Sequence, residues 1–298
     1  HNARDLEDYE RIAIQLPDFV FQNNENWQVE IESAAPIKLF HTTTDSKVHV
    51  TDETHAAAHL NHAWWIELPG SFLGECNPSA LLPNWWMWRV RTNGASTVYL
   101  LFKGGSAGSG PITAKLYQNG VLVGRGKAHL QLLDISSMYD HFTAGDTTAQ
   151  GVIPASTAQQ IGFSQLTGLD DDYILFVHGW RMEPWERRRF AETAFKRLWW
   201  QGYRGRFGLF SWPTEYSPVP FPPGNFQRSE LQAWRSGEPL RKLLKSLNAG
   251  VHHDRVRVFA HSMGNVACGE AFRQLTQAGY TNEVHTYAEM QGALASHC

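Results

Sequence analysis

A short apolar run that leads through one serine into an amphipathic segment constrains this chain most. Residues 256–260 (VRVFA) are rich in β-branched and aromatic side chains, as in a buried strand. Residues 263–277 then carry small and apolar side chains at helical spacing, and Gly279 follows as a helix stop. The sequence therefore predicts a sharp joint between a strand and a helix, with Ser262 in it.

The residues two before and two after Ser262 are small. A tight strand-to-helix turn strains the backbone at its serine and exposes the hydroxyl, so that larger side chains at these two positions would collide. Here they are Ala260 and Gly264, which makes AHSMG a one-residue variant of the G-x-S-x-G nucleophile elbow. The alternative is a serine that caps a helix starting at Met263, because serine is a favoured N-cap.

Length and charge exclude several classes of protein. A chain of 298 residues is long enough for two domains with sizeable cores. Its net charge of −3 gives no basic field, so we expect no nucleic-acid partner. We expect no membrane span, because no apolar run reaches the roughly 18–20 residues that a span needs, and we find no signal peptide. The compartment is not identified by the sequence, although we lean towards an extracytoplasmic or secreted protein.

Cysteine usage indicates no disulfide framework. The chain has three cysteines, Cys76, Cys268 and Cys298, and no CxxC pair. Cys268 falls on the core face of the helix after Ser262, so we expect it to be a buried free thiol.

Residues 1–150 are expected to form an all-β, sandwich-like domain. Short strand-like runs separated by turn residues are typical of a sandwich or a small barrel. Asn119-Gly120 is the strongest hairpin signal in the chain, because both turn positions accept positive φ. Residues 104–110 (GGSAGSG) are expected to form a flexible loop. The expected strands are residues 27–31, 37–40, 64–68, 86–90, 97–103, 112–118, 121–126 and 129–133.

Three histidines in this region suggest a metal hypothesis. In a helix, His55, His59 and His62 would share one face at a spacing suited to a metal ion. A polar connector that happens to carry histidines explains the segment as well, since position 56 is alanine and the HExxH pattern is absent. We therefore expect neither a metal nor a cofactor.

From residue 170 onwards, predicted strands alternate with predicted helices. We interpret residues 151–169 as a polar linker and residues 170–298 as a second domain. The alternation predicts an α/β fold with a mainly parallel sheet. The expected strands are residues 173–177, 206–212, 256–260 and 283–290, and the expected helices are 184–200, 229–248 with a kink or break near Gly237, and 263–277.

The first of these helices has a predicted apolar stripe. It consists of Ala191, Ala194, Phe195, Leu198 and Trp199. Residues 187–189 are three arginines in a row, and successive helical residues do not share a face. We therefore expect these arginines to form a solvated surface rather than an anion site.

Ligands of such a sheet bind beyond the carboxyl ends of its strands. The elbow at Ser262 lies at one such end, and His178-Gly179-Trp180 directly follows the strand that ends at Val177. An acyl-transfer serine needs two backbone N–H donors for the developing oxyanion. Met263 supplies one at the start of the helix, and Trp180 supplies the other, with Gly179 allowing close approach. We expect His178 to hold this loop by hydrogen bonds rather than to act as a base.

These motifs together resemble a known superfamily. VHGW, then PWERRRFAETAF, the strand RFGLFSWP and finally AHSMGN are similar to the α/β-hydrolase serine esterases and lipases, notably bacterial hydrolases that pair HGW with a late AHSMGN. The resemblance covers about residues 170–298. It implies a Ser262 nucleophile with Trp180 and Met263 as backbone oxyanion donors, and it makes residues 173–177, 256–260 and 283–290 the third, fifth and sixth strands.

The end of the chain departs from this family. The family places an acid and then a histidine after the serine, and its seventh and eighth strands are missing here. We expect the sequence to be a fragment whose general base and acid lie beyond Cys298. Glu289 as the acid and His297 as the base stay open within the chain.

The sequence thus predicts a serine hydrolase that cleaves a small-molecule carboxylic ester through an acyl-enzyme on Ser262. Amides, thioesters and acyl transfer would use the same residues. The alternative is a non-catalytic remnant of the fold that acts as a binding or adhesion protein, whose β domain contacts a surface or a glycan. A third interpretation is a metalloenzyme centred on the three histidines. An aromatic set after the second strand forms either an apolar rim for the acyl group or ordinary packing. Its members are Trp212, Tyr216, Phe221 and Phe226.

Overall fold

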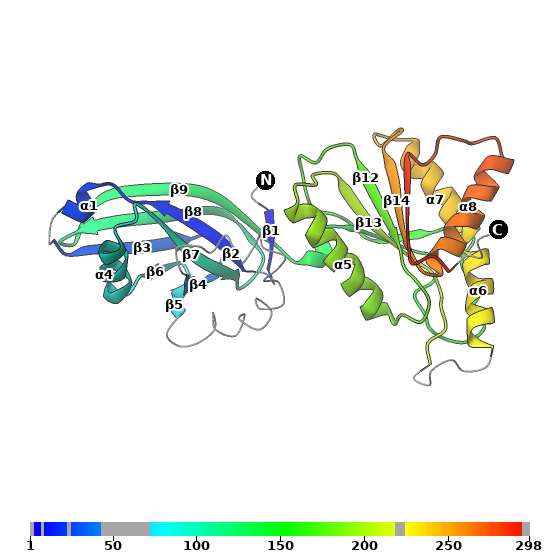
Figure 1. Ribbon diagram of the computed structural model, residues 1–298, viewed down its shortest axis with the longest axis horizontal. Coiled ribbons are helices and arrows are strands. Elements are labelled where there is room, and N and C mark those ends of the chain that lie inside the picture. The colour runs from blue at the N-terminus through cyan, green and yellow to red at the C-terminus, as the bar shows by residue number, and fades with distance from the viewer. Residues whose placement is uncertain (1–2, 7–8, 23–24, 43–71, 218–223, 294–298) are drawn as a thin grey trace. The chain divides into compact units, whose positions relative to one another are not determined.

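The chain forms two compact units, residues 1–135 and 136–298 (Figure 1). The computed structural model describes residues 3–6, 9–22, 25–42, 72–217 and 224–293. The boundary lies earlier than the predicted position near residue 150, because β10 (Asp140–Thr143) pairs in parallel with β13 (Arg206–Ser211) of the second unit. The expected linker also contributes to that sheet, since β11 (Gln159–Gly162) pairs with β10.

The N-terminal unit is β-rich, as predicted. Its described strands form a five-stranded sheet in the order β1-β9-β8-β3-β6 and a four-stranded sheet in the order β2-β7-β4-β5. Residues of β3 alternate between buried and half-buried, and buried side chains of both sheets share one apolar core. The strands are β1 (Ala3–Asp5), β2 (Glu10–Gln15), β3 (Trp27–Ser33), β4 (Ile37–His41), β5 (Phe72–Cys76), β6 (Ser79–Leu81), β7 (Thr97–Gly104), β8 (Gly108–Gln118) and β9 (Val121–Leu133), with the short helix α1 at Phe19–Gln22.

The hairpin predicted at Asn119-Gly120 is confirmed. Both residues have positive φ, 52° and 81°, and they join β8 to β9. The two strands expected over residues 121–126 and 129–133 are one continuous strand, because Lys127 and Ala128 also pair with β8. The glycine-rich loop is shorter than expected, since β8 already begins at Gly108.

The strand predicted at residues 86–90 is wrong. This segment belongs to the helix α4 (Asn84–Asn93), which ends at Gly94 in the left-handed conformation. Its aromatic and β-branched residues favoured a strand, but its burial has helical spacing: Trp86 and Val90 are buried, while Trp88 is exposed. The strand expected at residues 64–68 and the three histidines of the metal hypothesis lie outside the described residues.

The C-terminal unit contains a six-stranded sheet in the part that the structure describes. The strand order is β11-β10-β13-β12-β14-β15, and every neighbouring pair is parallel except β11 with β10. The further strands are β12 (Tyr173–Val177), β14 (Val256–His261) and β15 (Thr286–Met290). The helices are α5 (Pro184–Trp200), α6 (Asn225–Arg235), α7 (Gly237–Asn248) and α8 (Gly264–Gln277), and the predicted break near Gly237 separates α6 from α7.

Helices cover both faces of this sheet. In Figure 1, α5 lies on one face, and α7 and α8 lie on the other. Val256, Val258 and Ala260 of β14 belong to the apolar core shared with α7 and α8, which also contains the buried Cys268, as predicted. Phe259 and His261 face the side of α5, where they contact Phe176 and Phe190. The strands are therefore fixed from both faces, and their carboxyl ends are free to carry loops.

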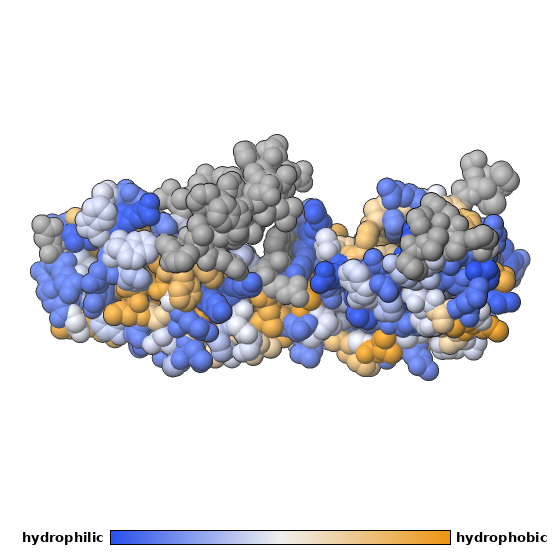
Figure 2. All heavy atoms as spheres, turned by 90° about the horizontal axis from the view of Figure 1, so that it is seen from below, coloured by the Kyte–Doolittle hydropathy of each residue, from blue (hydrophilic) through white to orange (hydrophobic). Residues whose placement is uncertain are grey.

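The surface shown in Figure 2 is mainly hydrophilic, with apolar residues gathered in smaller areas of each unit. Exposed large apolar side chains among the described residues include Trp88, Val121, Ile153, Phe163 and Val251. None of the helices that the structure describes combines the length and the apolar character of a bilayer-spanning segment.

Replacing Trp86 with alanine is expected to lower the free energy of unfolding of the N-terminal unit by about 3–5 kcal/mol, because the lost indole leaves a cavity. Trp88→Ala is the matched control and should change it by less than about 0.5 kcal/mol. Trp86 is 1% exposed and Trp88 is 69% exposed, whereas in a strand the two would point to the same face. Urea denaturation measures both effects, and equal losses in the two variants would contradict the helix.

Candidate active site

Ser262 occupies the turn between β14 and α8. Its φ is 51°, in the left-handed region where a residue with a side chain is strained. Its N–H donates to the Met290 carbonyl at 2.9 Å, and its own carbonyl accepts from the Asn265 N–H at 3.1 Å and from the Asn265 side-chain amide at 2.8 Å. These bonds hold the turn that the sequence predicted. The role of Ser262 as a nucleophile stays a prediction.

Two glycines allow the turn and the loop after β12 to touch. A Cβ on Gly264 would lie 2.6 Å from the His178 carbonyl oxygen and 2.7 Å from that of Val177. A Cβ on Gly179 would lie 3.0 Å from the Ser262 Cβ. Neither position has room for a side chain. The fold therefore brings together the two motifs, AHSMG and VHGW, that lie more than 80 residues apart in the chain.

His178 locks the loop after β12, as predicted. Its ring is fully buried and stacks on the Trp212 indole, with centroids 5.2 Å apart and 4° between the planes. Its Nδ1 donates to the Gly179 carbonyl at 2.8 Å, and its Nε2 accepts the Trp212 N–H at 3.0 Å. Burial, assisted by Arg187, holds the pKa of His178 well below its ordinary value. Both ring nitrogens are engaged and the ring is neutral, so His178 is not placed to serve as a base.

Arg187 was expected on a solvated surface, and this expectation is wrong. The side chain is completely buried. It donates to Asp146 at 3.1 Å, to the Met182 carbonyl at 2.9 Å and to the Trp212 carbonyl at 3.2 Å. Burial lowers the pKa of Arg187 to about 10, although the negative charge of Asp146 acts to raise it. The signal was in the sequence: position 187 lies one turn before Ala191 on the predicted buried stripe.

The loop after β13 bonds to the loop after β12 at further points. The Trp212 indole donates to the His178 carbonyl at 2.8 Å. The Arg181 N–H donates to the buried Thr214 hydroxyl at 3.1 Å, and the Arg181 guanidinium donates to the Ser217 carbonyl at 3.0 Å. The segment that follows β12 is therefore held along its length by the segment that follows β13.

The aromatic residues of this region divide between packing and surface. Trp212 is completely buried against His178, which rules out a rim position for it. Tyr216 and Phe226 are partly exposed, at 36% and 39%. Phe226 contacts the Trp180 ring edge-to-face at 5.2 Å. Phe221 lies outside the described residues.

Ser262 has no histidine partner among the residues that the structure describes. The neighbouring His261 points to the α5 side, where it stacks on Phe190 and its Nε2 lies 3.1 Å from the Gln291 side-chain oxygen. Glu289 is exposed at the end of β15. Glu289 makes no hydrogen bond to Ser262 in the described part of the chain, and His297 lies outside the described residues. In the described ranges, no group of three His, Cys, Asp or Glu side chains is arranged to hold a metal ion.

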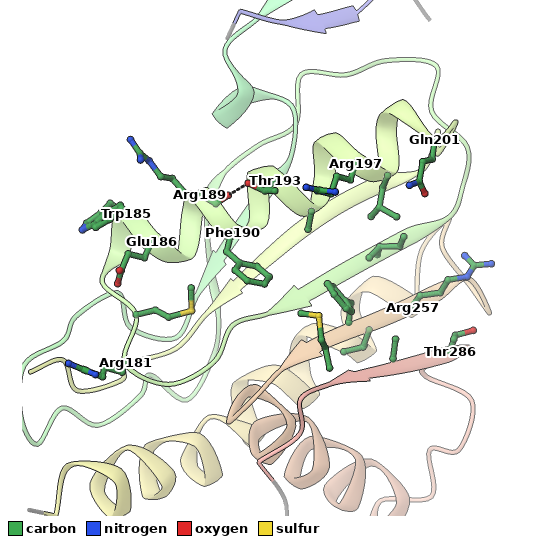
Figure 3. A pocket seen from close by; sticks show the side chains of 18 residues that line it. Arg181, Trp185, Glu186, Arg189, Phe190, Thr193, Arg197, Gln201, Arg257 and Thr286 are labelled. Atoms are coloured by element: carbon green, nitrogen blue, oxygen red, sulfur yellow. Dashed lines mark hydrogen bonds between the residues drawn. The ribbon is translucent and has the colours of Figure 1, made fainter. Parts of the chain in front are cut away.

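A groove of about 820 Å³ runs along α5 (Figure 3). Phe190 of α5 points into it, and Arg189, Arg197 and Arg257 lie along its sides. Besides residues of α5, the groove is lined by residues of β12, β14 and β15. Ala194 and Leu198 line this groove, which explains why these two members of the predicted stripe are only half-buried. Ser262 is not among the lining residues.

Comparison with known families supports the assignment suggested by this geometry. Residues 155–291, less than half of the chain, match the model of a family described as "Alpha/beta hydrolase of unknown function (DUF900)". The C-terminal unit is an α/β-hydrolase-type domain. The match confirms the resemblance drawn from VHGW and AHSMGN, and it includes β11 in the hydrolase-type unit. No curated protein matches the chain.

Gly264→Ala is expected to destabilise the hydrolase-type unit by about 2 kcal/mol or more, because its Cβ would overlap two backbone carbonyls. Gly250→Ala is the control, since a Cβ there would meet only the Leu247 carbonyl oxygen at 4.0 Å. Chemical denaturation compares the two. A Gly264→Ala protein as stable as the control would contradict the close approach of the two motifs.

His178 is expected to make the stability of the hydrolase-type unit depend on pH. Its pKa is lowered in the folded protein, so the unfolded chain binds a proton that the buried ring rejects. The stabilising contribution is present above the unfolded pKa of about 6.5 and is lost as the pH falls towards the lowered value. His178→Gln keeps a hydrogen-bond donor and an acceptor but does not titrate. The free energy of unfolding of this variant should therefore fall less than that of the wild type between about pH 7 and pH 5. Equal pH dependence in the two proteins would contradict a buried neutral His178.

Proposed function

We propose that the hydrolase-type unit is a serine hydrolase that cleaves carboxylic esters through an acyl-enzyme on Ser262. The observation that carries this proposal is the left-handed Ser262 in contact with Gly179 of the loop after β12. Ser262 is half-buried, and backbone strain at a residue with a side chain is typical of a functional position, where the surrounding structure enforces it. A helix-capping serine would need no such strain, because an N-cap residue adopts an extended backbone.

The proposed reaction uses two backbone N–H donors. The Ser262 Oγ adds to the carbonyl carbon of the ester while its proton passes to a base, and the carbonyl oxygen becomes an oxyanion. The N–H groups of Trp180 and Met263 stabilise this oxyanion. Collapse of the tetrahedral intermediate releases the alcohol, which takes up the proton, and water then cleaves the acyl-enzyme to the acid. Exposed Tyr216 and Phe226 would border the acyl or alcohol group of the substrate.

One observation favours a second candidate function. No described histidine is hydrogen-bonded to Ser262. This would be expected of a non-catalytic member of the fold that binds a partner with its β-rich unit. The strained turn argues against this alternative, because a binding protein gains nothing from a strained serine beside a locked loop.

The proposal predicts stoichiometric labelling of Ser262 by a fluorophosphonate ester, because such probes react with serines that a base and an oxyanion hole activate. Intact-mass measurement should show one added phosphonyl group per chain, and peptide mapping should place it on Ser262. Ser262→Ala should remove the label completely. Ser211→Ala is the control, since the Ser211 hydroxyl is buried against His141 and should not react.

Folded protein that takes up no probe would contradict a working acyl site in this chain and favour the binding function. Labelling that persists in Ser262→Ala would contradict the choice of nucleophile.

A further inference from the structure

The first turn of α6 holds the side chain of Trp180. The Trp180 indole Nε1 donates to the Asn225 Oδ1 at 2.9 Å. Phe226, the next residue of α6, contacts the same indole edge-to-face at 5.2 Å and 84°. Trp180 is the residue whose backbone N–H is the proposed oxyanion donor, so α6 is connected directly to that donor's side chain.

Asn225 is itself fixed by a buried carboxylate. Its Nδ2 donates to Glu215 Oε2 at 3.2 Å, and both side chains are 3% exposed. The Arg228 Nε donates to both carboxylate oxygens of Glu215 at 2.9 Å. The Ser229 hydroxyl accepts the Glu215 N–H at 3.1 Å. A buried carboxylate with these partners has little freedom to move, because leaving a buried charge without hydrogen bonds is costly.

This arrangement determines which way the Asn225 amide points. A carboxylate accepts hydrogen bonds and cannot donate them, so the NH₂ group of Asn225 must face Glu215. The Oδ1 atom must then face the Trp180 indole, which is a donor only. Asparagine at 225 therefore satisfies a donor on one side and an acceptor on the other.

The backbone on either side of Trp180 depends on surrounding contacts for its conformation. Gly179 precedes it and has no side chain, and Arg181 follows it with a strained φ of 58°. The direction of a backbone N–H is coupled to the position of the residue's own Cβ, so holding the indole narrows the range of directions open to the N–H.

We propose that Asn225 is a positioning residue, which aims the Trp180 N–H at the oxyanion by holding the Trp180 indole. The proposal rests on the proposed function of Ser262. The benefit arises in the transition state, because an oxyanion donor acts at about 2.7–3.1 Å and a displacement of about 1 Å can cost 10²-fold in rate.

The test compares Asn225→Ala and Trp180→Phe with the wild type. Trp180→Phe removes the indole N–H together with part of the ring, and it leaves the contacts between Asn225 and Glu215 in place. Both variants should lower kcat for a small soluble aryl ester and the rate of fluorophosphonate labelling by about 10- to 100-fold, with little change in KM. The double variant should be no slower than the slower single variant, because both remove the same bond.

Gln227→Ala, at an exposed position of the same helical turn, is the matched control and should keep the wild-type rates. Thermal melting checks the fold of each variant. The indole ¹⁵N–¹H spectrum gives a second readout: the resonance that disappears in Trp180→Phe should be the one that shifts most in Asn225→Ala. If Asn225→Ala does not fold, Trp180→Phe alone decides, since it replaces no residue of α6 and leaves the hydrogen bonds of Glu215 in place.

Wild-type protein that is labelled at Ser262, with both variants reacting at the wild-type rate, would overturn the role of Asn225 while leaving the proposed function intact. A rise in KM with unchanged kcat in both variants would also overturn it. Wild-type protein without any label on Ser262 would overturn the proposed function, and the role of Asn225 with it.

Discussion

The contact between the turn at Ser262 and the loop after β12 is the constraint on which the rest of the site depends. It brings the backbones of residues 177–179 and 262–264 together with no side chain between them. Parallel pairing of β12 with β14 aligns the two carboxyl ends, since Val177 pairs with Ala260. The loop and the turn then continue from adjacent strand ends. Glycine at 179 and 264 is required by this approach, and the strain at Ser262 is sustained by the bonds that Met290 and Asn265 make to it.

Buried polar side chains surround this contact and hold it in one arrangement. His178 joins the loops after β12 and β13, Arg187 joins the start of α5 to the same loops, and Glu215 joins the loop after β13 to α6. Each of these groups would cost free energy if its partners moved away, because an unsatisfied polar group in the interior is unfavourable. The result is a frame in which irregular loops at the sheet edge have few alternative conformations.

The sequence predicted those features that follow from local patterns. The strand 173–177 and the helix 184–200 agree with β12 and α5 in both bounds, because a continuous apolar run and a helix with Pro184 at its start are clear local signals. The joint at Ser262 followed from the small residues around it. The aromatic and β-branched content of residues 86–90 favours a strand, whereas the spacing of Trp86 and Val90 is that of one helix face.

Other features depend on contacts between distant segments, which a single sequence does not display. The pairing of β10 with β13 moved the boundary between the units, although residues 140–143 carry no strong strand pattern. The network of Trp180, Asn225 and Glu215 joins three polar or aromatic residues whose types alone indicate no partnership. The place of Arg187 on the α5 stripe predicts its burial, whereas its charge favours exposure. Buried polar residues were thus the least predictable part of the site.

A crystal structure of the protein after reaction with a fluorophosphonate ester tests the central claim most directly. We predict a phosphorus atom bonded to the Ser262 Oγ, with one phosphonyl oxygen about 2.7–3.1 Å from the backbone nitrogens of both Trp180 and Met263. A phosphonyl oxygen directed away from these two nitrogens, or a phosphonyl group on another residue, would contradict it.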